Sequence, residues 1–486
     1  MKNMFINDVG GNFKTALKDD NNKTIAHMIW GDPVRVEKES GVKSRVLTGR
    51  HKDGGWVDTS VLTASGLLEL YVIDVGQGDS VLMRTPDDEW HVIDAGIANE
   101  EQMTKRGAAN FIRWKFQNDL GRPGVSLRNV VITHPDFDHY GGMLDLLAGT
   151  LNDGRTFPIE VETFWHSGLA RFADEPALGK TVKGSVASIP FGEFGLKADG
   201  TFITELLDDK ASFAQPKRRF ESTFARLAAL VGKVPKKVRR IDHRIGYFPG
   251  YKPKAGRASI RVLGPVLEET TPAARGLRYL GSESVTRNGH SVVLRVDFGK
   301  SRILLTGDLN SRSQCLLLSY QPGDEFAADV AKGCHHGSDD IDMRFVRAMA
   351  ARATIISSGD NEDYAHPRPR VLGASARYGR EAKDLDGGVL PPLIYSTELA
   401  RSIKLCTAAA VRERGKPSPL LQAANAEIKS SESGAKFRPL THTPISTDLI
   451  YGLINVRTDG ERILCGYMKE NTSDFDIQVF RAGVDA

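Results

Sequence analysis

Apolar runs that end in glycine or polar turns dominate the sequence from about residue 67. The runs at 67–75, 81–85 and 90–94 are predicted to be buried strands, because each is short, apolar and closed by a turn signal. A helical stretch at 100–117 follows, and then another buried strand at 129–133. Strands and helices alternate from there to about residue 405. This alternation predicts an α/β sandwich with mixed sheets.

The second half of the chain contains two predicted hairpins and two segments that interrupt the alternation. Residues 291–308 form two β-rich runs around a glycine, and residues 446–468 turn at an Asp-Gly pair. The segment at about 195–258 is basic and is predicted to be an insertion. The segment at about 408–440 is rich in Ala, Lys, Ser and Pro, which predicts a long loop excursion.

Residues 1–65 carry short β-rich runs separated by Gly-Asp-Pro and Gly-Gly turns. The run with Trp56 and Val57 after the second turn resembles the closing strand of a bacterial SH3-like module. The alternative is a β-hairpin extension of the main domain. The predicted organisation is a β module at 1–65, a main domain at 66–405, and a C-terminal part at 406–486 whose hairpin completes that domain.

Composition and the N-terminus exclude several classes of protein. The chain is 40% hydrophobic and 26% charged, which is ordinary for folded domains, and its net charge of +4 does not by itself indicate nucleic acid. Four cysteines without a C-x-x-C pair exclude a disulfide framework. There is no apolar secretory segment, and no run approaches the roughly 18 apolar residues of a membrane span. We therefore expect a cytoplasmic protein with no membrane partner.

Potential metal ligands cluster directly after the predicted strand at 129–133. Within six residues the chain carries His134, Asp136, Asp138 and His139. Imidazole and carboxylate groups bind zinc, manganese or iron. Asp308 follows the apolar run ILLT, and His335 and His336 follow another apolar segment. We expect these strand ends to meet at one metal centre. The alternative for the first four residues taken alone is a solvated acidic loop.

These motifs, in this order, resemble the metallo-β-lactamase superfamily, and in particular the hydrolase domain of the ComEC/Rec2 competence proteins. The first motif reads H-x-D-x-D-H, with Asp136 where most of the superfamily has histidine. The other matching motifs are D-V-G-Q-G-D at Asp74–Asp79, H-H-G-S at His335–Ser338 and Y-x-H-P at Tyr364–Pro367. The resemblance spans about residues 67–405 and implies a four-layer αββα sandwich.

The resemblance also implies a centre of two divalent ions, zinc or manganese. The implied ligands are His134 and Asp136 for the first ion, Asp138 and His139 for the second, Asp308 as the bridge, and His336 or alternatively His335 to complete the second site. Asn288 stands near the position of a further histidine in many relatives, and His290 is adjacent. A hydroxide bridging two such ions is a nucleophile at neutral pH, because a metal lowers the pKa of bound water from about 15.7 to about 7.

Further residues are candidates for proton transfer and substrate contact. The candidate catalytic residues are Asp79, Asp138, His335 and His366, and the candidate substrate contacts near the centre are Asn288 and Ser338. Asp79 would orient a ligand or a bound water, with a turn aspartate as the alternative. The resemblance places His366 at the site, where it would donate to a phosphoryl oxygen or protonate a leaving group. Ser338 would contact substrate or cap the following helix.

A basic segment lies between Pro216 and Arg240, with nine Lys or Arg residues and a single acid. Such a patch can neutralise phosphates. The predicted contact residues are Lys236, Lys237, Arg239 and Arg240. The alternative is an amphipathic helix with a solvated basic face, whose apolar side recurs at helical spacing in Phe220, Phe224, Leu227 and Leu230.

The leading interpretation is a metal-dependent phosphodiesterase or nuclease, with DNA or RNA as substrate and partner. The second is a small-molecule phosphodiesterase, either phosphorylcholine-esterase-like or acting on a signalling nucleotide. The third is a hydrolase subunit that a protein partner recruits to a larger assembly through residues 1–65. Hydrolysis of β-lactams is not expected, because the first motif departs from that branch.

Overall fold

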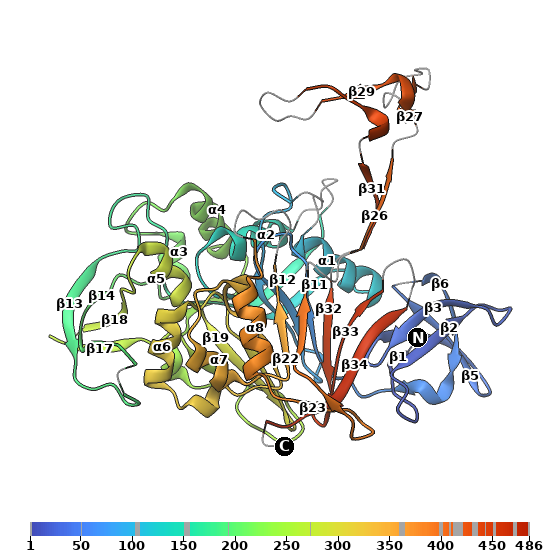
Figure 1. Ribbon diagram of the computed structural model, residues 1–486, viewed down its shortest axis with the longest axis horizontal. Coiled ribbons are helices and arrows are strands. Elements are labelled where there is room, and N and C mark those ends of the chain that lie inside the picture. Colours follow the sequence, from blue (N-terminus) through green and yellow to red (C-terminus); the bar gives the residue numbers. More distant parts are fainter. Residues whose placement is uncertain are drawn as a thin grey trace.

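Two β-sheets packed face to face form the centre of the computed structural model (Figure 1). The structure describes residues 2–49, 51–102, 107–149, 156–192, 194–272, 274–358, 365–397, 402–407, 410–411, 421–429, 436–442, 444–450, 453–469 and 474–484. Tyr364 of the predicted Y-x-H-P motif lies outside these residues.

The larger sheet has nine strands. Six come from residues 68–240 and three from the C-terminal residues 454–481. Its order is β15 (Lys237–Arg240), β12 (Ile159–His166), β11 (Val125–Ile132), β10 (Trp90–Ala95), β9 (Ser80–Arg84), β8 (Leu68–Val72), β32 (Ile454–Thr458), β33 (Arg462–Met468) and β34 (Phe475–Arg481). Strands β10, β11, β12 and β15 run parallel, and the rest pair antiparallel. The predicted hairpin at 446–468 is confirmed for its Asp-Gly turn, which joins β32 and β33, but residues 446–450 belong to a separate strand outside this sheet.

The smaller sheet has six strands. Its order is β16 (Ser259–Gly264), β19 (Val293–Phe298), β20 (Ser301–Leu305), β21 (Val330–Lys332), β22 (Ala353–Ile356) and β25 (Leu393–Ser396). The hairpin predicted at 291–308 is confirmed as β19 and β20. Strands β20, β21, β22 and β25 run parallel, so their carboxyl ends lie at one edge.

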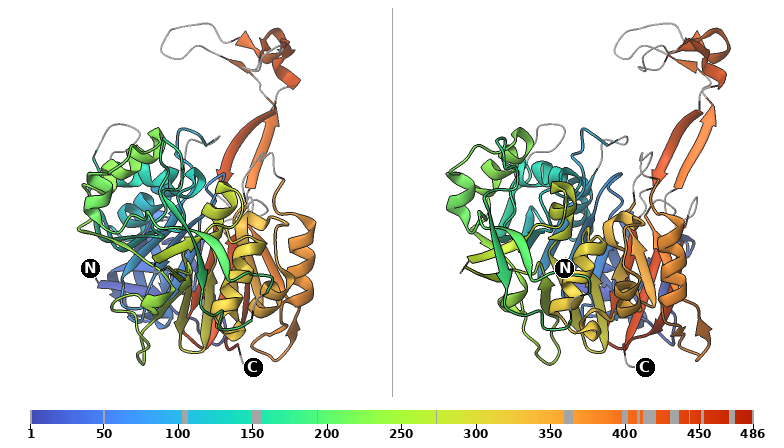
Figure 2. Two further views of the ribbon diagram at one scale, coloured as in Figure 1. Left: turned by 90° about the vertical axis from the view of Figure 1, so that its left-hand side faces the viewer. Right: turned by 60° about the vertical axis from the view of Figure 1, so that its left-hand side comes forward.

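Alternating side chains divide the core into three apolar layers. Leu70 and Val72 point between the two sheets, whereas Tyr71 and Ile73 point to the outer face. The outer face of the larger sheet packs on α1 (Ala108–Trp114), α2 (Phe137–Ala148) and α4 (Ser222–Val231). The outer face of the smaller sheet packs on α6 (Ser311–Tyr320), α7 (Met343–Met349) and α8 (Pro369–Tyr378). The predicted α/β sandwich with mixed sheets is therefore confirmed, with helices outside each sheet (Figure 2).

The N-terminal residues form a separate all-β sheet of seven strands. Its order is β3 (Thr24–Ile29), β2 (Lys14–Lys18), β6 (His51–Asp58), β5 (Lys43–Thr48), β4 (Pro33–Ser40), β1 (Lys2–Ile6) and β7 (Leu62–Thr63). The sheet has its own apolar core around Leu17, Met28 and Val46. It is tied to the larger sheet by Arg457, which ion-pairs with Asp32 at 2.8 Å.

The basic segment predicted as an insertion at about 195–258 contributes to two parts of the structure, a small barrel and the main sandwich. β14 (Asp199–Ile203) closes a small barrel with β13 (Thr181–Val186), β17 (Glu268–Thr271) and β18 (Ala274–Arg278). By contrast, α4 packs against α2, and β15 is the edge strand of the larger sheet. Two short helices, α3 (Lys210–Ala214) and α5 (Glu283–Gly289), lie beside these elements (Figure 1).

The segment predicted as a loop excursion at about 408–440 stands on a two-stranded ribbon. The strands β26 (Ser402–Thr407) and β31 (Pro444–Ile450) pair antiparallel and project from the sandwich (Figures 1 and 2). Short strand pairs lie beyond it, namely β27 (Ala410–Val411) with β28 (Leu421–Gln422) and β29 (Glu427–Ile428) with β30 (Arg438–Pro439). At the end of the sandwich away from this ribbon, β23 (Ala382–Lys383) pairs with β24 (Val389–Leu390) and contacts β34 (Figure 1). No helix among the described residues is long and apolar enough to cross a membrane.

Candidate metal centre

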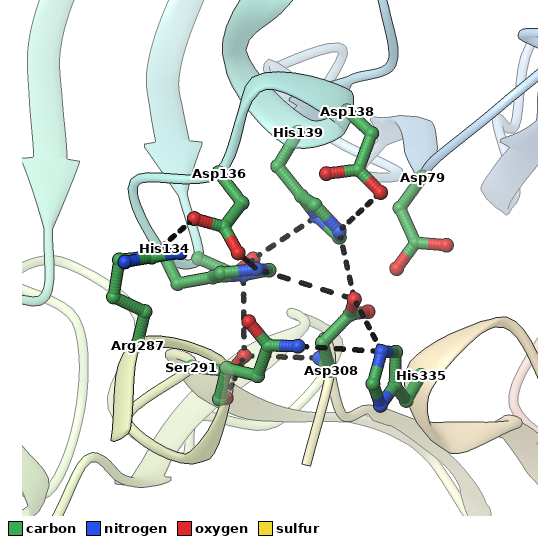
Figure 3. A network of polar contacts seen from close by, with 12 residues as sticks. Asp79, His134, Asp136, Asp138, His139, Arg287, Ser291, Asp308 and His335 are labelled. Atoms are coloured by element: carbon green, nitrogen blue, oxygen red, sulfur yellow. Dashed lines mark hydrogen bonds and ion pairs between the residues drawn. The ribbon is translucent and has the colours of Figure 1, made fainter. Parts of the chain in front are cut away.

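The carboxyl ends of three strands bring the predicted metal ligands together. β11 ends at Ile132, and the loop after it leads into α2, whose first turn carries Asp138 and His139. Asp308 follows β20, and His336 follows β21. Figure 3 shows Asp138, His139 and Asp308 pointing toward one another. The strand-end pattern therefore placed residues from distant parts of the sequence at one edge of the sandwich.

Four of these side chains form a compact group, here called the four-ligand cluster: Asp138, His139, Asp308 and His336. One ligand atom from each lies within 4.8 Å of the others. The Oδ2 atom of Asp308 is 3.1 Å from His139 Nε2 and 3.0 Å from His336 Nε2. Two carboxylates and two imidazoles at this spacing fit a divalent ion such as zinc or manganese, so the residues present suit the metal that the sequence implied.

Hydrogen bonds on the far side of each imidazole hold the cluster in orientation. Asp94 contacts His139 Nδ1 at 2.7 Å, and the carbonyl oxygen of Ser357 lies 3.1 Å from His336 Nδ1. Both histidines therefore turn Nε2 toward the cluster, as ligating histidines do. His335 and His336 both have positive φ, 47° and 52°, so the backbone is strained where the second histidine enters the site.

The electrostatics of the cluster keep its carboxylates ionised. Burial opposes ionisation of Asp138, but His139 and His336 outweigh it and hold the pKa of this carboxyl well below its usual range. Burial likewise opposes the charged form of His139, yet Asp308 and Asp94 raise its pKa well above the usual value. A divalent cation bound in place of the protons on these histidines would offset the negative charge of the same carboxylates.

His134 and Asp136, here called the first-ion side, are arranged differently. His134 Nε2 lies 3.8 Å from Asp136 Oδ2 and 4.0 Å from Asp308 Oδ2. This nitrogen is buried without a hydrogen-bond partner among the described residues, while Nδ1 lies 3.1 Å from the hydroxyl of Thr133. Burial lowers the pKa of His134 to about 4. The Thr133 hydroxyl donates to Asp94, so Nδ1 of the neutral ring donates to that hydroxyl and Nε2 keeps the lone pair. That orphaned nitrogen suits a metal ion.

Asp136 is already engaged by two arginines. Its Oδ1 atom accepts from Arg287 Nε at 2.6 Å and from Arg171 Nη1 at 3.0 Å. With its amide nitrogen facing this carboxylate, Asn288 also donates to Asp136 Oδ2 at 2.8 Å and accepts from His335 Nε2 at 3.2 Å. The first-ion side therefore has fewer uncommitted ligands than the four-ligand cluster. Sequence reasoning missed both arginines, which lie far from the metal motifs along the chain.

A buried lysine lies directly behind the cluster. Lys332, the last residue of β21, forms an ion pair with Asp79 and lies 3.5 Å from Asp308 Oδ1. Asp79 is also 3.2 Å from His336 Nδ1, so it contacts a cluster histidine from outside. Burial opposes the charge on Lys332, but Asp79 and Asp308 outweigh it and raise its pKa. The signal for this residue was available in the sequence, because a lysine stands at the end of an otherwise apolar run shortly before the two histidines.

The remaining predicted residues lie at different distances from the cluster. His335 is 27% exposed and 3.9 Å from Asp308 Oδ2, and its ring lies 6.0 Å from that of His366. Ser338 does not cap α7, because Asp342 is its N-cap and accepts from Arg344. The capping alternative for Ser338 is therefore wrong. His290 is buried, and its Nε2 contacts the carbonyl oxygen of Arg278 at 2.7 Å, away from the centre.

The four basic residues predicted to contact substrate lie on or beside the edge strand β15. Lys236 and Lys237 pair with Glu162 at 3.2 and 3.0 Å, and Arg240 pairs with Asp208 at 2.8 Å. Arg239 is exposed. Within the described part of the chain, no hydrogen bond or ion pair links these four to the four-ligand cluster. The amphipathic-helix alternative fits α4, where Phe224 and Leu227 are buried against the larger sheet.

Comparison with known families places the centre in context. A family model described as the metallo-beta-lactamase superfamily matches residues 73–212, which include the H-x-D-x-D-H motif. The chain contains a metallo-β-lactamase superfamily domain. Its topology of two mixed sheets between helices, with the ligands at one edge, is the metallo-β-lactamase fold predicted from the motifs.

Two curated relatives match part of this chain. It is similar to ComE operon protein 3 of Bacillus subtilis, with 32% identity over 97 residues, and to competence protein ComA of Neisseria gonorrhoeae, with 31% identity over 104 residues. The matches cover 20% and 21% of this chain but 12% and 15% of those proteins. Among solved structures, the metallo-beta-lactamase fold protein YhfI from Bacillus subtilis aligns with 68% of this chain and 96% of its own, at 10% identity and a TM-score of 0.31. The predicted resemblance to the competence-protein branch is confirmed.

Proposed function

We propose that this chain is a metal-dependent phosphodiesterase that hydrolyses DNA or RNA with two divalent ions, zinc or manganese. The observation that carries the proposal is the buried four-ligand cluster, whose ligand atoms lie within 4.8 Å of one another. Bound divalent ions would lower the pKa of water and stabilise charge on a phosphoryl oxygen. Asp308 would be a ligand shared by both ions, because its Oδ2 atom lies 3.1 Å from His139 Nε2 and 4.0 Å from His134 Nε2.

The side chains around the cluster divide the remaining work. His335 and His366 form a pair at the partly exposed side of Asp308, where one of them would protonate the leaving oxygen. Asp138 and Asp79 would accept hydrogen bonds from the attacking water or from the histidines that orient it. Ser338 would donate a hydrogen bond to the substrate. Asn288, the other predicted substrate contact, already donates to Asp136 and Ser284, so it would act by holding Asp136 and His335 in position.

Nucleic acid is proposed as the substrate because the motifs resemble the competence-protein branch and one curated relative is named competence protein ComA. The exposed basic residues Lys236, Lys237 and Arg239 would extend the contact along a polynucleotide. A small-molecule phosphodiesterase is the second candidate. It is favoured by the acidic partners of this patch, since Glu162 and Asp208 already offset part of its charge.

Residues 1–65 are proposed to form an SH3-like module that recruits a protein partner, with residues 66–405 as the catalytic domain and 406–486 completing it. The support is the independent apolar core of the seven-stranded sheet. Recruitment by this sheet would make the enzyme a subunit of a larger assembly.

A substrate panel tests the proposed activity. Protein loaded with manganese or zinc is incubated with single-stranded DNA, double-stranded DNA, RNA and bis-p-nitrophenyl phosphate, with a chelated sample as control. We expect metal-dependent cleavage of a polynucleotide and of the small diester. Absence of cleavage in every metal-loaded sample would contradict the proposal.

The basic patch separates the two candidate substrates. Replacing Lys236, Lys237, Arg239 and Arg240 with Gln should raise KM for the polynucleotide and flatten its salt dependence, because fewer counterions are released on binding. Hydrolysis of bis-p-nitrophenyl phosphate should not change. If neither substrate responds, the small-molecule phosphodiesterase becomes the better proposal.

A further inference from the structure

We propose that Arg287 and Arg171 form an anion subsite beside the metal centre that binds a phosphate group of the substrate. The inference rests on the proposed phosphodiesterase function and names the residues that read its anionic substrate. Both arginines meet at Oδ1 of Asp136, one from α5 and the other from the loop after β12 (Figure 3 shows Arg287 and Asp136).

Arg287 uses only part of its hydrogen-bonding capacity within the protein. Its Nε atom donates to Asp136 at 2.6 Å. In the described part of the chain, Arg287 donates only through Nε, and neither terminal nitrogen has a hydrogen-bond partner. The side chain is 14% exposed. The planar pair of N–H donors that suits a phosphate is therefore still uncommitted.

Arg171 repeats this arrangement from the other side of the same carboxylate. Its Nη1 atom donates to Asp136 at 3.0 Å, and its Nε atom forms an ion pair with Glu221. Nη2 has no partner among the described residues, and the side chain is 24% exposed. Asp136 thus fixes two guanidinium groups next to each other, which avoids most of the entropy cost of ordering them when an anion binds.

The position of the pair matches a substrate held at the metal centre. Asp136 Oδ2 lies 3.8 Å from His134 Nε2, which lies 4.0 Å from Asp308 Oδ2. Asp136 thus connects Arg287 to His134, and through it to Asp308 of the four-ligand cluster. An ester bound at the cluster would therefore place an adjacent anionic group within reach of the guanidinium pair, and a neutral substrate would leave the pair unused.

The alternative is that the two arginines only hold Asp136 in place. The two roles predict different behaviour. A residue that acts through Asp136 would change metal content when it is removed, whereas an anion-binding residue would change phosphate affinity at constant metal content. The comparison therefore needs both measurements on the same variants.

Inorganic phosphate is the probe. Full-length protein loaded with manganese is titrated with phosphate by calorimetry, and bound metal is measured by mass spectrometry. Arg287→Gln should weaken phosphate binding by about 10- to 100-fold, the range for losing a hydrogen bond to a charged group. Arg287→Lys should recover part of the loss, because it restores the charge but not the planar donor pair. The matched control is Arg226→Gln, which removes an exposed arginine of α4.

Each result decides the inference. Weaker phosphate binding in Arg287→Gln, with metal content and the Arg226→Gln control unchanged, supports the subsite. Unchanged phosphate affinity, a parallel loss of metal, or no phosphate binding by the parent protein overturns it. If phosphate binding depends on Arg287 but no phosphodiester is cleaved, the proposed function fails and the subsite stands.

Discussion

The four-ligand cluster and the first-ion side occupy one centre but differ in how their side chains are committed. In the cluster, Asp308 faces two histidine nitrogens at 3.0 and 3.1 Å, and hydrogen bonds behind those rings aim them inward. On the first-ion side, His134 points an unpartnered nitrogen at Asp136, yet Asp136 is neutralised by two arginines. Ligands from one sequence motif can therefore form two unequal metal sites. On the first-ion side the arginines already offset the charge of Asp136, so less negative charge remains to attract a metal ion.

Asp308→Asn should have the largest effect, since this residue faces both sides of the centre. The amide carries no charge to hold the ions, so we expect activity to fall by about 1,000-fold or more while the fold is retained. Activity, bound metal and circular dichroism are measured together. The control is Asp339→Asn, an exposed carboxylate elsewhere on the same edge. Normal turnover with both ions retained would show that Asp308 does not bridge.

Removing one carboxylate from each side tests the comparison itself. Asp138→Asn should lower the affinity of the tighter ion by more than about 100-fold, because altering a residue that merely supports a ligand already costs about 10- to 100-fold. Asp136→Asn should leave that affinity nearly unchanged. Equilibrium dialysis of the two variants gives both values. Equal losses would mean that the two sides are not distinct.

Lys332→Met probes the charge behind the cluster. The substitution leaves Asp79 and Asp308 buried without their cation, so the protein without added metal should lose about 3 kcal/mol of unfolding free energy. Added manganese should reduce this loss, since the ion supplies the missing positive charge. Chemical denaturation with and without metal measures the difference. Lys300→Met, at an exposed pair with Glu461, is the control and should change little. A loss that metal does not reduce would separate Lys332 from the centre.

Asp136→His should have the smallest effect. It restores the commoner histidine motif and should shift the metal preference toward zinc by a modest factor, because imidazole is a softer ligand than carboxylate. Competition dialysis with equal zinc and manganese measures the ratio. An unchanged ratio would show that Asp136 does not set the metal preference.

The sequence predicted the parts of this molecule whose signals are local. Apolar runs marked the strands, and ligand-type residues at strand ends marked the cluster, because parallel strands bring their carboxyl ends to one edge. It did not predict that Ile454 pairs with Val72, since register between strands so far apart depends on the whole fold. Arg171 and Arg287 were missed because they are not metal ligands and meet Asp136 only in three dimensions.

A metal titration tests the inequality of the two sides most directly. Protein stripped of metal is dialysed against increasing free manganese, and bound ions are counted per chain. We predict one ion held tightly and a second held at least about 10-fold more weakly, as expected when one side lacks uncommitted ligands. In Asp138→Asn, the tightly bound ion should be lost before the weakly bound one as the free manganese concentration is lowered. Two ions of equal affinity, or a tight ion that survives Asp138→Asn and is lost in Asp136→Asn, would contradict the account.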